Sequence, residues 1–351
     1  MKRFWIRAAA LFAAALLFLP RAQALGVSAE SAILMDAATG RVLYEKNADR
    51  RSLIASTTKM MTALVVCRRC NLSDRVRIMP EAVGIEGSSV YLRPGEVLTV
   101  EELLYGMMLH SGNDAAVALA IYCGGTVEGF AALMNDEARR LGLTGTHFTN
   151  PNGLDSPEHY STARDLARLA ACAMDEPAFA RIVGAKSVRI GERVLTNHNK
   201  LLWRLEGAEG VKTGYTKAAG RILVSSARRE GRRLIAVSLN APDDWNDHIR
   251  LMNWGFGQFS QRELVEPGQT VGTVEVWMHR ATAVPLVAAE GFSFALAQGE
   301  TVEFLVPGAG FVYGPVEAGA DAGFVYLMLE GKPVGKIPVR YGAGVSAGTG
   351  G

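Results

Sequence analysis

The residues Ala55-Ser-Thr-Thr-Lys-Met-Met-Thr-Ala-Leu64 are the most informative part of this chain for predicting its fold. A helix is predicted from about Ser56 to Val66, and its apolar residues cover nearly the whole circumference. A helix that is apolar on almost every side is buried, so this segment should run through the middle of the first domain. Ser56 and Lys59 lie three residues apart and therefore share one face of that helix.

This spacing predicts that Lys59 lies beside the Ser56 hydroxyl. Burial lowers the pKa of a lysine, and the neutral amine can take a proton from a serine. The positive field at a helix N-terminus also favours an alkoxide. The alternative is an ordinary N-cap serine followed by a surface lysine. The apolar surroundings of Lys59 disfavour that alternative, because an idle buried charge is costly.

A second polar triplet, Ser111-Gly112-Asn113, lies between predicted helices at 99–110 and 115–123. A serine at this place can relay a proton toward a leaving amine, and an asparagine can hydrogen-bond the amide of a substrate. Taken alone, the triplet is equally typical of a plain loop that separates two helices.

The third triplet, Lys212-Thr213-Gly214, lies in a predicted strand at 211–216. A lysine there adds positive potential, a threonine offers a hydroxyl to a carboxylate, and a glycine lets backbone approach a ligand. Lys212 and Gly214 point to one face and Thr213 to the other, unless the strand twists or bulges. An edge strand of this kind can pair with an extended peptide. Taken alone, the triplet also fits a solvated strand end.

Together the triplets occur in the order S-x-x-K, S-x-N and K-T-G, separated by about fifty and then about one hundred residues, a set found in class A β-lactamases and penicillin-binding proteins. The chain resembles the low-molecular-mass penicillin-binding proteins, which are D-alanyl-D-alanine carboxypeptidases of peptidase family S11. The similarity spans about residues 27–258, and the remainder is similar to the family's C-terminal domain. Besides residues 55–64, the blocks that carry it are Ser111-Gly-Asn-Asp-Ala-Ala116, Asn150-Pro-Asn-Gly-Leu-Asp155, His159-Tyr-Ser-Thr-Ala163, Asn199-Lys-Leu-Leu202 and Gly210-Val-Lys-Thr-Gly-Tyr-Thr216.

The resemblance implies a serine acyl-enzyme that forms on peptidoglycan pentapeptide stems. Ser56 would attack the carbonyl between two D-alanines with Lys59 as the base, and the backbone N–H groups of Ser56 and Tyr215 would form the oxyanion hole. Ser111 and Asn113 would assist protonation and positioning. Water would then release the shortened peptide, without a metal or an organic cofactor. β-Lactam antibiotics would acylate the same serine.

In the same resemblance, Lys212, Thr213 and Gly214 would bind the terminal carboxylate of the substrate. Some relatives carry an arginine within the segment that reads Asn197-His198-Asn199 here, and another where this chain has Asp243-Asp244-Trp245. His198 can replace the missing charge only when it is protonated, so Lys212 would otherwise act alone. The family also tends to have histidine at the position of Asn152, which we interpret as structural.

Three other functions stay open from the sequence. A β-lactamase would need a carboxylate that activates the deacylating water, and Asp155 and Glu158 lie in the region after Asn150. A catalytically silent protein that binds the cell wall would retain the fold alone. Endopeptidase activity on crosslinks would use the same acyl-enzyme.

The expected fold is a serine transpeptidase/β-lactamase-like α+β domain at 25–260. Strands predicted at 31–35, 41–44, 211–216, 221–227 and 233–239 form a five-stranded antiparallel sheet, flanked by helices that include a closing helix at 248–256. From residue 261 short strands and turns predict a small all-β domain up to residue 341. It would act as a spacer, with weak contact to a membrane or a cell-wall protein. The Gly/Ala-rich tail at 342–351 is predicted to be disordered, and it is no amphipathic anchoring helix.

The first 24 residues predict a secretory signal. Lys2, Arg3 and Arg7 precede an apolar run at 8–19, and Ala22-Gln-Ala24 is typical of a cleavage site. The alternative is an uncleaved anchor, for which the run is short. The protein is therefore expected in the cell envelope, the periplasm or the medium.

Composition narrows the partners and the chemistry further. The formal net charge of +2 and the lack of a basic run disfavour nucleic acid as a partner. Export permits disulfides. We interpret Cys67, Cys70, Cys123 and Cys172 as small buried residues with at most one structural bridge, and not as a metal or redox site.

Overall fold

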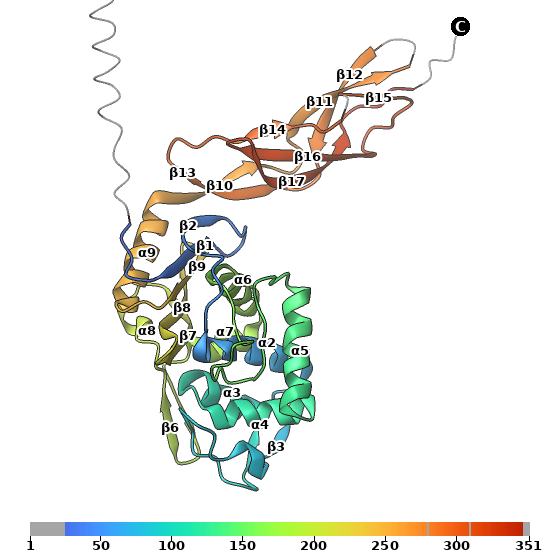
Figure 1. Cartoon of the computed structure of the whole chain (residues 1–351). Coiled ribbons are helices and arrows are strands. Elements are labelled where there is room, and N and C mark those ends of the chain that lie inside the picture. The colour runs from blue at the N-terminus through green and yellow to red at the C-terminus, as the bar shows by residue number, and fades with distance from the viewer. Residues whose placement is uncertain (1–24, 279–280, 309, 347–351) are drawn as a thin grey trace, which may run out of the picture.

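A five-stranded antiparallel sheet organises the larger domain of the computed structural model, which describes residues 25–278, 281–308 and 310–346 (Figure 1). The strand order is β2-β1-β9-β8-β7, so the N-terminal hairpin lies beside the late strands, as predicted. The predicted signal at 1–24 and the last five residues of the tail lie outside the described residues. The strands are β1 (Ser31–Asp36), β2 (Val42–Lys46), β7 (Ala208–Thr216), β8 (Gly220–Arg229) and β9 (Arg232–Leu239).

The two faces of this sheet are covered by different helices. In β1, Ile33 packs into the core on the α2 side, whereas Leu34 packs against Leu251 of α9. This alternation follows from the two-residue period of a strand, and it gives three layers. The helices are α2 (Lys59–Arg69), α3 (Val100–Leu109), α4 (Asn113–Gly124), α5 (Val127–Arg140), α6 (Ala163–Met174), α7 (Pro177–Gly184), α8 (Leu201–Arg204) and α9 (Asp244–Gln258).

The helix α2 is central, as its apolar sequence predicts. Every residue from Lys59 to Val66 is buried. Ser56, however, lies just before α2 in a short 3-10 turn, η1 (Ala55–Thr58), rather than in the α-helix itself. A second 3-10 turn, η2, spans Pro80–Ala82. Within the described residues, no single helix is long and apolar enough to cross a membrane.

Helix starts follow local hydrogen bonding. Thr99 accepts from the backbone of Glu102, whose carboxylate accepts from the backbone of Thr99, and this capping box begins α3. The closing helix α9 begins at Asp244, four residues earlier than predicted. Its first turn contains Asp244 and Asp247, and acidic side chains favour a helix N-terminus although they interrupt the apolar pattern.

Two small two-stranded sheets were not predicted. They pair β3 (Arg75–Arg77) with β4 (Val97–Thr99), and β5 (Ser187–Ile190) with β6 (Arg193–Thr196). Their strands have only three or four residues. So short a run gives little periodic signal.

The C-terminal domain is all β, as predicted. Its core contains Val265, Val276, Val325 and Ile337. The predicted boundary between residues 260 and 261 falls inside the first strand, which begins at Phe259. The strands are β10 (Phe259–Val265) paired with β13 (Phe292–Ala297), and a sheet of β14 (Glu303–Leu305), β16 (Asp321–Leu329), β17 (Lys332–Tyr341), β12 (Ala281–Ala288), β11 (Thr270–Trp277) and β15 (Phe311–Tyr313).

One arginine joins the two domains. Arg41, at the turn before β2, donates from both terminal nitrogens to Glu300, at 2.9 and 2.6 Å. Its guanidinium carbon lies 5.1 Å from the centre of the Phe259 ring and 5.2 Å from that of Phe294. The C-terminal domain therefore attaches at the β1–β2 end of the larger domain, as Figure 1 shows.

Candidate active site

The backbone around Ser56 is tightly enclosed. Ala55, directly before it, has a φ of +44°, which is strained for a residue with a side chain. A Cβ on Gly153 would lie 2.0 Å from the carbonyl oxygen of Ala55, and one on Gly214 would lie 3.3 Å from the backbone nitrogen of Ser56. The glycine at 153 thus lets its segment pack against the backbone of Ala55, and the glycine at 214 lets β7 pack against the backbone of Ser56.

Lys59 lies beside Ser56, as the spacing predicts. Its Nζ is 3.0 Å from Ser56 Oγ, 2.7 Å from Asn113 Oδ1 and 2.6 Å from the carbonyl oxygen of Asn152. The side chain is fully buried. The ammonium or amine is therefore held on three oxygens and directed at the hydroxyl. Asn152 contributes through its backbone, which agrees with a structural position.

The electrostatics of the two buried lysines differ from those of surface lysines. Burial lowers the pKa of Lys59 well below its usual value, and the charge of Lys212 lowers it further, while the Asp114 carboxylate opposes these effects. Burial also lowers the pKa of Lys212 to about 7. Lys59 can therefore exist as a neutral amine, which is the form that accepts a proton.

A cavity of about 300 Å³ opens in front of Ser56. Among the predicted site residues, its lining contains Ser56, Ser111, His198, Thr213, Gly214 and Tyr215. They come from η1, the turn between α3 and α4, the loop after β6, and the edge strand β7. Segments far apart in the sequence thus meet at one surface.

The other three predicted residues lie behind this surface. Lys59, Asn113 and Lys212 are buried and are not part of the lining. Lys212 Nζ donates to the carbonyl oxygen of Thr213 at 2.9 Å, so it supports the strand from inside. Thr213 lines the cavity, and the predicted contacts of Lys212 and Thr213 with a substrate carboxylate stay predictions.

Asn113 is held at both ends of its amide. Its Oδ1 accepts from Lys59, and its Nδ2 donates to the carbonyl oxygen of Glu86 at 2.5 Å. In this arrangement Asn113 orients the lysine, and its predicted contact with a substrate amide stays a prediction. Ser111 has a φ of +62° at the turn before α4, and this strain brings it to the cavity.

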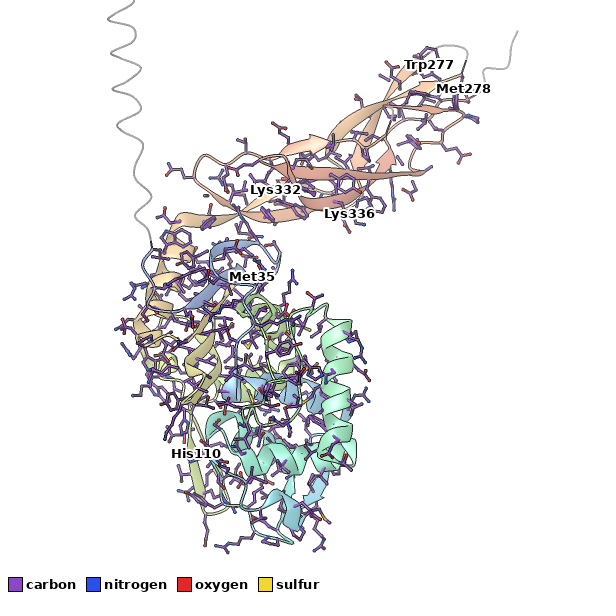
Figure 2. All side chains as sticks on the ribbon, in the orientation of Figure 1. Met35, His110, Trp277, Met278, Lys332 and Lys336 are labelled. Atoms are coloured by element: carbon purple, nitrogen blue, oxygen red, sulfur yellow. The ribbon has the colours of Figure 1, made fainter. Side chains whose placement is uncertain are left out.

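His198 is uncharged at neutral pH. Burial, together with the charge of Lys212, lowers its pKa to about 4. Its backbone donates to the carbonyl oxygen of Leu109, and its ring lies 4.9 Å from the ring of His110, at the end of α3 (Figure 2). His198 can therefore contribute a hydrogen bond to a ligand but no positive charge.

Sequence reasoning missed several residues of the cavity. Ser88 lines it because the buried Asp114 carboxylate binds the loop that follows Ser88, accepting from the backbones of Val90 and Leu92. No motif marks that loop in the sequence.

Arg221 also lines the cavity, together with Asp244 and Trp245 from the segment that the resemblance had already singled out. The signal for Arg221 was the hairpin after Lys212-Thr213-Gly214, which pairs Tyr215 with Arg221 across the two strands. Arg221 Nη2 donates to Asp244 Oδ1 at 2.6 Å.

The carboxylates that a class A β-lactamase would need are not at this cavity. Asp155 and Glu158 are both exposed and do not belong to its lining. The carboxylate that does line it, Asp244, is paired with Arg221. Asp155 and Glu158 therefore do not lie where a carboxylate could activate water at Ser56.

Comparison with known proteins agrees with this geometry. Residues 20–243 match the D-alanyl-D-alanine carboxypeptidase family, peptidase S11, and residues 259–346 match the C-terminal domain of penicillin-binding protein 5. The chain is 33% identical to D-alanyl-D-alanine carboxypeptidase DacF of Bacillus subtilis, across 91% of this chain and 86% of that protein. It is 36% identical to DacC of Escherichia coli, across 90% and 84%.

Solved structures give the same answer. Penicillin-binding protein 5 of Haemophilus influenzae superposes with a TM-score of 0.79 at 30% identity, covering 92% of this chain and 98% of that one. A DD-transpeptidase of Streptomyces K15 covers 66% of this chain and 98% of its own, with a TM-score of 0.64 at 36% identity. The chain belongs to the D-alanyl-D-alanine carboxypeptidase family of serine peptidases, family S11.

Proposed function

We propose that this protein removes the terminal D-alanine from peptidoglycan stem peptides, as a serine-type carboxypeptidase with Ser56 as nucleophile. The observation that carries the proposal is the pair formed by Ser56 and Lys59. A fully buried Nζ lies 3.0 Å from a hydroxyl that faces a cavity. Membership of the S11 family supports the choice of a D-alanyl-D-alanine peptide over other acyl donors.

In the acylation step, Ser56 Oγ attacks the carbonyl carbon of the penultimate D-alanine. Lys59, as a neutral amine, takes the hydroxyl proton. The tetrahedral oxyanion is bound by the backbone N–H groups of Ser56 and Tyr215. When the C–N bond breaks, the proton passes to the leaving nitrogen with Ser111 as the relay, and free D-alanine departs.

In the deacylation step, water attacks the Ser56 ester, and the shortened peptide leaves with a new carboxylate. The serine regains its proton from that water. β-Lactams enter the same path, since their strained amide acylates Ser56. The ring-opened product stays covalently bound, and this would make the protein a penicillin-binding protein.

The strand β7 is suited to hold the peptide. It is the edge of the sheet, and Thr213, Gly214 and Tyr215 line the cavity along it. An extended stem peptide can pair with such an edge by backbone hydrogen bonds. We infer that its scissile carbonyl then lies between Ser56 and the backbone of β7.

The site of action that we propose is outside the cytoplasmic membrane, after export directed by residues 1–24.

The C-terminal domain would then make a weak contact with the membrane surface. Trp277 and Tyr313 pair across β11 and β15 and are 45% and 80% exposed. Trp277 lies at the end remote from the larger domain (Figure 2). Exposed Trp and Tyr favour the membrane interface. Loss of vesicle co-sedimentation in a Trp277→Ala/Tyr313→Ala variant tests the contact.

The catalytic proposal is tested by D-alanine release. Purified residues 25–351 are incubated with diacetyl-Lys-D-Ala-D-Ala, alongside Ser56→Ala and, as a matched control, Ser52→Ala. We expect release by the wild type and by the Ser52 variant, and none by the Ser56 variant. Release by Ser56→Ala equal to that of the wild type would show that another group is the nucleophile.

A further inference from the structure

The cavity in front of Ser56 must neutralise a carboxylate if a peptide with a free C-terminus is to bind there. Three nearby basic groups are poor candidates. His198 is neutral at neutral pH, because its pKa is lowered to about 4. Lys212 is buried and donates to the carbonyl oxygen of Thr213. Lys59 is directed at Ser56. The demand for a positive charge therefore points to another residue.

Arg221 meets this demand. It lies on β8 directly across from Tyr215, and its side chain lines the same cavity as Ser56 and Thr213. The side chain is 43% exposed, so a ligand can reach it. A guanidinium stays charged at every pH at which proteins are folded, and its planar fork fits a carboxylate.

The position of Arg221 is set by two neighbours at the start of α9. Asp244 Oδ1 accepts from Arg221 Nη2 at 2.6 Å, and the Trp245 ring centre lies 5.9 Å from the guanidinium carbon. The Asp244 side chain is almost fully buried and also accepts from the backbone of Trp245 at 2.8 Å. Since a guanidinium has five N–H donors, this arrangement leaves others for a ligand.

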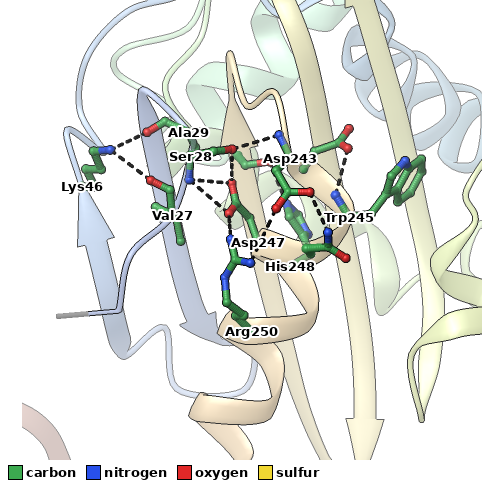
Figure 3. A network of polar contacts seen from close by, with 12 residues as sticks. Val27, Ser28, Ala29, Lys46, Asp243, Trp245, Asp247, His248 and Arg250 are labelled. Atoms are coloured by element: carbon green, nitrogen blue, oxygen red, sulfur yellow. Dashed lines mark hydrogen bonds and ion pairs between the residues drawn. The ribbon is translucent and has the colours of Figure 1, made fainter. Parts of the chain in front are cut away.

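The start of α9 is itself fixed to the segment that precedes β1. Asp247 accepts from the backbone of Ser28 at 3.0 and 2.9 Å and from its hydroxyl at 2.7 Å, and Ser28 Oγ accepts from the backbone of Asp243 at 3.0 Å (Figure 3). Trp245 lies between Asp243 and Asp247, in the first turn of α9 that these hydrogen bonds hold. Asp244 and Trp245 are therefore held in place before any ligand binds, which lowers the entropic cost of binding.

We propose that Arg221 is the residue that recognises the terminal carboxylate of the substrate, with Asp244 and Trp245 as its positioning residues. The inference rests on the proposed function, because the ligand is the free C-terminus of the peptide or the carboxylate of a β-lactam. In this chain the positive charge that binds the carboxylate comes from β8, the strand beside β7. Some relatives instead carry an arginine in the segments equivalent to 197–199 and 243–245.

The test compares two acyl donors that differ only in the carboxylate. Hippuryl-thioglycolate carries it, and its methyl ester does not. For each, kcat/KM is measured with the wild type, Arg221→Gln and Arg228→Gln. Gln at 221 can still donate to Asp244. Arg228 is a matched control, because it lies on the same strand, has the same 43% exposure and pairs with one carboxylate, that of Glu209, away from this cavity.

We expect Arg221→Gln to lower kcat/KM for the carboxylate donor by about 10- to 100-fold, the usual worth of a hydrogen bond to a charged group. The kcat/KM for the methyl ester should change less than about twofold, which also shows that the variant is folded. Arg228→Gln should keep the preference of the wild type. If Arg221→Gln keeps the wild-type ratio of kcat/KM for the carboxylate donor to kcat/KM for the ester, the role of Arg221 is wrong. The proposed function is then unaffected. A wild type that turns over neither donor overturns the proposed function and the inference with it.

Discussion

At the level of single residues, the proposed chemistry depends on the burial of Lys59, which lowers the pKa of its amine. The sequence placed Lys59 one helical turn from Ser56 and in apolar surroundings, and both features are present. What could not be predicted is the set of oxygens around Nζ. The Asn152 carbonyl is 93 residues away in the chain and carries no side-chain signal. Local spacing reveals a pair on one turn, whereas distant backbone partners depend on the whole fold.

The lowered pKa of Lys59 predicts a pH dependence. Because the neutral amine is the base, the rate of acylation by a fluorescent penicillin should rise with pH and level off above a pKa well below that of free lysine. Lys59→Arg keeps the cation but cannot accept the proton, so acylation should fall by about 10²- to 10⁴-fold. Stopped-flow rates across the pH range check this. An Arg variant as fast as the wild type would exclude Lys59 as the base.

Gly153 should tolerate no side chain. Its φ is +89°, and a Cβ would lie 2.0 Å from the Ala55 carbonyl oxygen. Gly153→Ala should therefore destabilise the fold by more than about 2 kcal/mol and slow acylation at Ser56. Gly142→Ala is the matched control, because Gly142 has a φ of +67° and no atom lies within 4 Å of a Cβ placed there. This substitution should lower the free energy of unfolding by about 1 kcal/mol. Urea unfolding measures both, and equal losses would argue against the close packing.

At the scale of the element, periodic helices were predictable and short hairpins were not. Apolar residues at helical spacing predict helices at 127–141 and 162–174. The structure has α5 at Val127–Arg140 and α6 at Ala163–Met174, within a residue of those bounds. The β5–β6 hairpin has two four-residue strands with Arg189 and Arg193 among them, a pattern that resembles a loop. The start of α9 was missed because its first turn is polar.

The contact of α9 with the sheet predicts a dependence of stability on pH. His248 is buried on α9, with Nδ1 2.6 Å from Ser225 Oγ of β8 and Nε2 2.9 Å from Ser238 Oγ of β9. Burial lowers its pKa from 6.5 to about 3. Between these values the unfolded chain binds more protons, so the free energy of unfolding falls as pH falls through this window and is fully retained above pH 6.5.

The change in the free energy of unfolding due to His248 can reach about 1.4 kcal/mol per pH unit. His248→Gln keeps a donor and an acceptor but does not titrate, so the curve of stability against pH should be flatter in this variant. Urea unfolding at several pH values between 3 and 7 gives both curves. Identical slopes would show that His248 is protonated in the folded protein.

At the scale of the whole molecule, the layered larger domain followed from the strand and helix pattern, but the attachment of the second domain did not. The predicted hairpin and late strands do form one sheet. The ion pair of Arg41 with Glu300 joins residues 259 positions apart. A single charged pair at such a separation leaves no trace in local composition.

This junction predicts a coupling between Arg41 and Glu300. Their side chains are 13% and 21% exposed, so loss of either should lower the thermal midpoint of the C-terminal domain, and the double variant should lower it little further. The ion pair of Arg50 with Glu30 is the control, because these side chains are 56% and 42% exposed. Loss of this pair should change the thermal midpoint little. Calorimetry measures the transitions. Additive effects of Arg41→Ala and Glu300→Ala would contradict the coupling.

The position of the acyl group after reaction with penicillin shows which residue is the nucleophile. The denatured protein is digested with trypsin, which releases Ser52-Leu-Ile-Ala-Ser-Thr-Thr-Lys59, and the peptide is fragmented in a mass spectrometer. We expect a penicilloyl adduct on this peptide, located at Ser56 and absent from Ser56→Ala. An adduct at Ser111 or elsewhere, or no adduct in the wild type, would contradict the assignment of Ser56 as the nucleophile.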